Sequence, residues 1–92
     1  EAMAAKGWAL YQLRREKQAI ALLTEAATTA PGSPEAMYFL GLIAKQRGNR
    51  DEAVSWLRKA IAGGARTPVA RRAREALLEI EATAPDAAAA SN

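Results

Sequence analysis

The chain has 92 residues, half of them hydrophobic, and a formal net charge of +3. It has no cysteine and no histidine, which excludes disulfides, thiolate metal sites and the side chain that most often serves as a general base. No apolar run approaches the ~20 residues that a membrane span needs. Alanine, the strongest helix former, supplies 24 of the 46 hydrophobic residues, and no segment alternates apolar and polar residues over a strand's length. The sequence therefore predicts an all-α fold.

Turn signals divide the chain into five predicted helices. The charged segment 14–17 separates the first helix from the second, and the third ends at Gly48 and Asn49, where glycine supplies the left-handed conformation that closes a helix. Ser33 and Thr67 are favourable N-caps, and each is followed by a proline, which suits the first helical turn. We expect helices over residues 2–14, 17–29, 34–47, 50–62 and 68–83.

The chain matches itself when it is shifted by 34 residues. The shift aligns Gly7 with Gly41, Ala19 with Ala53, Leu23 with Leu57, and Ala26 with Ala60. A glycine inside a helix costs ~1 kcal/mol relative to alanine, so its presence indicates that another helix passes close by. The alanine, leucine and alanine that follow lie on one face of the second helix. The pattern predicts two antiparallel helix pairs, each packed tightly at its glycine.

This pattern resembles the tetratricopeptide repeat, a 34-residue unit of two helices. The second unit carries the family's residue types at Leu40, Gly41, Gly48, Ala53 and Ala60. It departs from them where Leu57 replaces an aromatic residue and Ala65 replaces the closing proline, and the first unit has Lys6 where leucine is usual. The resemblance implies an α-solenoid of two helix-turn-helix hairpins plus one solvating helix. The expected array covers 1–83, with repeat one at 1–33, repeat two at 34–67 and a capping helix at 68–83, and an Ala-rich disordered tail follows at 84–92.

In this family the first helix of each pair lines a concave groove, which holds an extended peptide or a helix of a partner protein. The resemblance therefore implies a peptide-binding groove at Trp8, Tyr11, Gln12, Tyr38, Leu42, Lys45, Gln46 and Arg72, with Ala4, Ala76 and Glu79 as further lining positions. Helical spacing places Tyr38, Leu42 and Lys45 on one face. The alternative for Trp8 and Tyr11 is packing on a neighbouring repeat. Trp56 and Phe39 are interpreted as packing between helices.

Two other functions stay open beside a protein-binding scaffold. The first is a structural or self-association module within a larger multi-repeat protein, with a weak homodimer through the uncapped N-terminal face at Met3, Trp8 and Leu10. The second, less favoured, is a nucleic-acid binder that uses the basic residues Lys59, Arg66, Arg71, Arg72 and Arg74. No aromatic residue lies among these basic residues, so the sequence provides no side chain there on which a base could stack.

Some members of the family grip a peptide's terminal carboxylate with lysine, asparagine and arginine at fixed groove positions. Those positions read Ala4, Trp8, Phe39, Val69 and Ala73 in this chain, and none of these side chains can pair with a carboxylate. The sequence therefore disfavours a carboxylate-clamp function of that kind.

The sequence offers no catalytic, cofactor or metal site. It has no phosphate-binding glycine loop and no nucleophile motif, and Glu75, Glu79 and Glu81 do not converge on one helix face. We therefore expect a non-enzymatic protein without cofactors. The alanine- and arginine-rich composition resembles that of high-GC bacteria. Because the chain begins at Glu1 and not at a methionine, we expect a soluble fragment or processed form without its targeting signal, and the compartment stays open between cytoplasm and periplasm.

Overall fold

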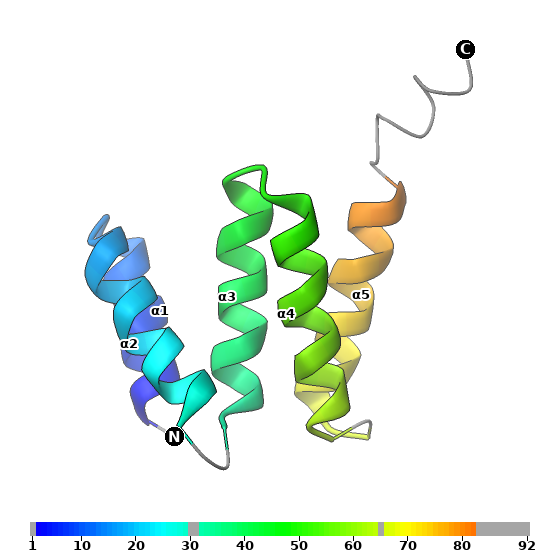
Figure 1. Ribbon diagram of the computed structural model, residues 1–92, viewed down its shortest axis with the longest axis horizontal. Helices are drawn as coiled ribbons and strands as arrows, with labels where there is room; N and C mark the ends of the chain where they lie inside the picture. The colour runs from blue at the N-terminus through cyan, green and yellow to red at the C-terminus, as the bar shows by residue number, and fades with distance from the viewer. Residues whose placement is uncertain (1, 30–31, 65, 83–92) are drawn as a thin grey trace.

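The computed structural model describes residues 2–29, 32–64 and 66–82, and within them it contains helices and no strand (Figure 1). The helices are α1 (Ala2–Gln12), α2 (Glu16–Thr28), α3 (Pro34–Gln46), α4 (Arg50–Ala62) and α5 (Pro68–Ala82). The all-α prediction and the five predicted helices are confirmed. The largest difference is at α1, which ends at Gln12 and not at residue 14. The predicted tail at 84–92 lies outside the described residues.

The helices form two antiparallel hairpins that stand side by side (Figure 1). The first pairs α1 with α2, the second pairs α3 with α4, and α5 follows on the far side of α4. Helix α3 is central, because it contacts each of the other four helices. Its position between the hairpins makes it the helix that any surface spanning both repeats must include.

The two helix glycines meet the leucines that the repeat pattern predicted. A Cβ atom added at Gly7 would lie 2.6 Å from Cγ of Leu23, and one added at Gly41 would lie 2.7 Å from Cγ of Leu57. Both leucines are fully buried. Real Cβ atoms do not approach another carbon so closely, so only glycine allows these helices to pack at this distance. The prediction of tight helix pairs at Gly7 and Gly41 is confirmed.

The core is divided into two clusters, and α3 supplies residues to both. The first cluster contains Ala4, Leu23, Ala27, Ala36, Leu40 and Ile43. The second contains Ala44, Ala53, Leu57, Ala60, Ala73, Ala76 and Ile80. In the first repeat Ala27 is buried, whereas the predicted core residue Ala26 is only half-buried. Alanine supplies three of the six residues of the first cluster and five of the seven of the second, and these small side chains let helix backbones approach closely.

The starts of α3 and α5 are capped alike. The Ser33 hydroxyl accepts a hydrogen bond from the backbone N–H of Ala36 at 3.2 Å, and the Thr67 hydroxyl accepts one from Ala70 at 3.0 Å. Each bond satisfies a backbone donor that the helix itself leaves unpaired. The two caps lie 34 residues apart, so α5 begins in the same register as α3. Residues of α3 and α5 that lie 34 positions apart can therefore meet, as Lys45 and Glu79 do.

Candidate functional site

The predicted groove residues lie on α1, α3 and α5, and α3 contacts both of its neighbours. They differ in exposure. Trp8, Tyr11, Tyr38, Leu42 and Lys45 are half-buried, and Gln12, Gln46 and Arg72 are exposed. Half-buried aromatic and aliphatic side chains combine a fixed position with a surface that is still open to a ligand. These residues are therefore suited to binding and not only to packing.

Four aromatic side chains form a continuous cluster across the two hairpins. The ring of Trp8 stacks with that of Tyr11, with centroids 5.4 Å apart, and with that of Phe39 at 4.9 Å. The ring of Phe39 in turn contacts Tyr38, tilted by 49° at 5.5 Å. Such pairs contribute about 0.5–1.5 kcal/mol beyond the area that they bury. We call Trp8, Tyr11, Tyr38 and Phe39 the aromatic cluster.

Phe39 is the member of this cluster that the sequence analysis did not include among the predicted groove residues. It was interpreted as packing between helices, and it does pack against the first core cluster. It also contacts both Trp8 of α1 and Tyr38 of α3, so the ring contacts of the aromatic cluster run through it. Trp8 contacts Phe39, and Tyr11 contacts Gln46, both residues of the second repeat.

Two polar contacts join the three helices of this face. The Tyr11 hydroxyl donates a hydrogen bond to Oε1 of Gln46 at 2.6 Å and so links α1 to α3. Nζ of Lys45 donates to Oε1 of Glu79, also at 2.6 Å, and so links α3 to α5. Both contacts are exposed, so each contributes little to stability. They connect the three helices that carry the predicted groove residues.

Two of the further lining positions belong to the core instead. Ala4 is buried in the first core cluster, and Ala76 is buried in the second. This corrects the sequence analysis, which placed both along the groove. Helical spacing puts an alanine on a given face, but it does not say whether larger neighbours cover so small a side chain. Ala4 and Ala76 therefore belong to the core and not to the predicted groove surface.

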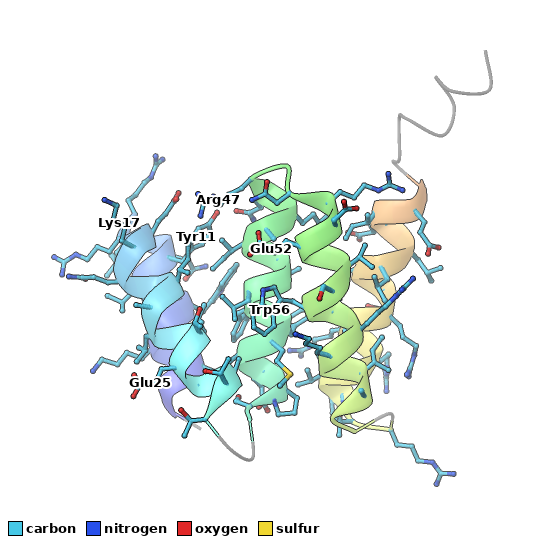
Figure 2. The ribbon with its side chains drawn as sticks, viewed as in Figure 1. Tyr11, Lys17, Glu25, Arg47, Glu52 and Trp56 are labelled. Carbon is cyan, nitrogen blue, oxygen red and sulfur yellow. The ribbon has the colours of Figure 1, made fainter. Side chains whose placement is uncertain are left out.

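Trp56 lies on α4, which carries none of the predicted groove residues. This ring packs against the first core cluster, as the sequence predicted, and Nζ of Lys59 lies 4.9 Å from its centroid. A small pocket of about 70 Å³ opens beside it, between α2 and α4. The pocket is lined by Ile20, Leu40, Ile43, Ala44, Arg47, Asn49, Glu52 and Trp56. Figure 2 labels Trp56, Glu52 and Arg47 around this space.

Over the residues that the structure describes, no three acidic, histidine or cysteine side chains gather as metal ligands would. In the same residues, none of the helices is both long enough and apolar enough to cross a membrane.

Residues 10–77 match the family model described as tetratricopeptide repeat. The matched segment covers more than half of the chain and runs from α1 into α5. The chain belongs to the tetratricopeptide repeat family. A search of curated proteins and a search of solved structures each found no match.

Membership in this family explains why two structural features recur at a separation of 34 residues. The glycine–leucine contacts and the capped starts of α3 and α5 recur at the family's repeat length. Tetratricopeptide repeats generally mediate protein–protein interactions, and the family is typically a non-catalytic scaffold.

Proposed function

We propose that this chain is a non-catalytic protein–protein interaction scaffold whose groove binds an extended or helical segment of a partner protein. The observation that carries the proposal is the aromatic cluster, which stays half-exposed although it spans both hairpins. Affinity in protein interfaces is concentrated in a few aromatic and cationic residues. Trp8, Tyr11 and Tyr38 supply apolar anchors, and Lys45 and Arg72 supply positive charge.

The experiment compares the immobilised wild-type chain with Tyr38→Ala as bait for partner proteins. Leu78→Ala is the matched control, because Leu78 is 63% exposed on α5 and is not a groove residue. Loss of the Tyr38 ring should weaken partner binding by at least ~1 kcal/mol, whereas the control should bind as the wild type does. Circular dichroism checks that both variants are folded. Equal capture by Tyr38→Ala and wild type would refute groove binding.

A second candidate function is self-association through the end of the first hairpin. Of the three residues proposed for that face, Trp8 and Leu10 are half-buried, and the side chain of Met3 lies outside the described part of the structure. The observation that favours the idea is a different residue, Leu13, which is 67% exposed at the end of α1. Exposed apolar surface promotes association.

A further inference from the structure

The turn between α4 and α5 lies among charged side chains of one sign. The chain has no acidic residue between Glu52 and Glu75, a stretch that comprises most of α4, the turn and the first half of α5. The two helices are antiparallel neighbours, so these parts lie together at the lower end of the molecule (Figure 1). Their exposed cations, which we call the basic end, are Arg58, Lys59, Arg66, Arg71, Arg72 and Arg74.

Three carboxylates lie toward the basic end, and they do not neutralise it. Glu75 follows the arginines of α5, and Glu25 lies toward the same end on α2 (Figure 2). Glu35 is next to Pro34 at the start of α3, which meets the end of α4, because a Cβ atom added at Gly63 would lie 3.0 Å from Cγ of Pro34. Six cations against three carboxylates leave an excess of three positive charges. The other carboxylates of α4 and α5 lie at the opposite ends of these helices: Asp51, Glu52, Glu79 and Glu81.

The basic end offers charge but little apolar surface. Among the described residues, the large hydrophobic side chains that are most exposed are Leu13, which follows α1, and Leu78, in the second half of α5. A protein partner would need apolar anchors at the centre of its interface, and a membrane would need an apolar face that enters it. The phosphate backbone of a nucleic acid needs neither, because cations that displace its counterions supply the affinity. Charge without apolar surface therefore favours a nucleic acid.

The kind of cation and the state of the nearest aromatic ring favour a duplex. Five of the six cations are arginines, whose planar guanidinium groups pair with phosphate through two parallel hydrogen bonds. Single strands are bound by stacking their bases on exposed aromatic rings. The aromatic residue of this stretch, Trp56, is half-buried against the first core cluster, and Nζ of Lys59 lies 4.9 Å from its ring centroid. The ring is thus covered, whereas a duplex presents its phosphates without any base having to unstack.

We propose that the basic end binds the phosphate backbone of a nucleic-acid duplex without regard to base sequence. This goes beyond the proposed function, because it gives the chain a second interaction surface of different chemistry. Of the six cations, only Arg72 also belongs to the predicted groove. The other five allow the two surfaces to be tested separately.

The test measures the fluorescence anisotropy of labelled DNA and RNA duplexes of mixed sequence, titrated with the full chain at several salt concentrations. We expect the wild type to bind at about 50 mM salt, with a binding constant whose logarithm falls linearly with that of the salt concentration. The triple variant Arg58→Gln, Arg66→Gln and Arg71→Gln should reduce this slope by roughly two to three and weaken binding at least about ten-fold at the lowest salt. Circular dichroism checks its fold, and Arg71→Gln alone should reduce the slope by about one.

The matched control removes the same number of cations from the turn between α1 and α2, through Arg14→Gln, Arg15→Gln and Lys17→Gln. These residues are exposed, and Lys17 lies at the upper end of the first hairpin, away from the basic end (Figure 2). Because the two triple variants have the same net charge, the control should keep the wild-type slope and bind within about three-fold of the wild type. Tyr38→Ala, a groove variant, should bind the duplexes as the wild type does.

Several results would overturn the inference. These are no binding of either duplex at low salt, equal losses in the two triple variants, or duplex binding that Tyr38→Ala weakens. Tighter binding of single-stranded DNA, of polyglutamate or of vesicles of phosphatidylcholine and phosphatidylserine than of the duplexes would assign the basic end to that class of partner instead. Neither triple variant changes a predicted groove residue, so the capture experiment with Tyr38→Ala decides the proposed function independently.

Discussion

Arg14 and Gly48 occupy equivalent positions 34 residues apart, and both have the left-handed backbone conformation, with φ of 69° and 82°. Each closes the first helix of its hairpin with the same pair of hydrogen bonds. The N–H groups of residues 14 and 15 donate to the carbonyls of residues 11 and 10, and those of residues 48 and 49 donate to residues 45 and 44. This is the Schellman motif, which glycine usually completes. In the first turn the left-handed position of the motif is occupied by arginine, Arg14.

The first prediction concerns this turn. Arg14→Gly should stabilise the fold by about 0.5–1 kcal/mol. A residue with a Cβ is destabilised by about 1–2 kcal/mol in the left-handed conformation, and glycine removes this strain. Part of the gain is lost because glycine also makes the unfolded chain more flexible. Gly48→Ala should destabilise the fold by about 1 kcal/mol for the same reason, although no atom lies within 4 Å of the added Cβ. Urea unfolding measures both changes.

Arg15→Gly is the matched control for the turn. It removes the same charge from the next residue, whose φ of −99° is ordinary. Its free energy of unfolding should fall slightly or stay unchanged. A gain as large as that of Arg14→Gly would mean that relief of charge repulsion, and not of backbone strain, explains the effect.

The second prediction concerns the helix contact at Gly41. A Cβ atom there would lie 2.7 Å from Cγ of Leu57 and 3.3 Å from the carbonyl oxygen of Ala53. Gly41→Ala should therefore cost about 1–3 kcal/mol of stability, and Gly41→Leu should cost more. In a double-mutant cycle with Leu57→Ala, the combined loss should be smaller than the sum of the two single losses. Strict additivity would show that the two residues do not share one contact.

Much of the fold could be predicted from the sequence because its signals are local. Proline, glycine and hydroxyl residues mark the helix ends, and the glycine-to-leucine spacing repeats in both hairpins. What the sequence missed has no local signal. Arginine rarely adopts the left-handed backbone conformation, so nothing in the sequence predicted it at Arg14. The turn was therefore interpreted as a charged segment between helices. The first helix was accordingly predicted two residues too long.

The groove was harder to predict than the fold. Helical spacing predicted that Tyr38, Leu42 and Lys45 share one face of α3, and all three are half-buried. It could not say that Ala4 and Ala76 are covered, since alanine suits a core and a surface equally. Nor did it identify the pair of Lys45 with Glu79, which depends on the distance between two helices. The 34-residue separation of the pair was the signal that could have found it.

The third prediction concerns how the groove meets a partner. Lys45→Glu places a second carboxylate beside Glu79 and reverses a charge in the groove. It should mainly slow association with an acidic partner and reduce the effect of salt on that rate, because charges steer encounter more than they hold a complex. Stopped-flow measurements at several salt concentrations test this. Arg58→Glu, an exposed α4 residue outside the proposed groove, is the control. If both variants slow association equally, net charge and not the groove is responsible.

The last prediction concerns self-association of the chain. Leu13 and Leu78 are the two large hydrophobic residues that are most exposed among the described ones, at 67% and 63%. Leu13 directly follows α1 and has the half-buried Leu10 three residues before it, whereas Leu78 has the charged residues Glu75 and Arg74 three and four residues before it. An apolar side chain with apolar neighbours contributes more to an interface than one among charges, because the charges must lose water.

We therefore expect the wild-type chain to dimerise weakly between micromolar and millimolar concentration, and Leu13→Glu to remove the dimer. Leu78→Glu makes the same substitution at a similarly exposed site and should leave the dimer intact. Sedimentation equilibrium measures the association constants of all three proteins. A wild-type chain that stays monomeric throughout this range would refute the prediction, and a dimer lost only in Leu78→Glu would move the interface to α5.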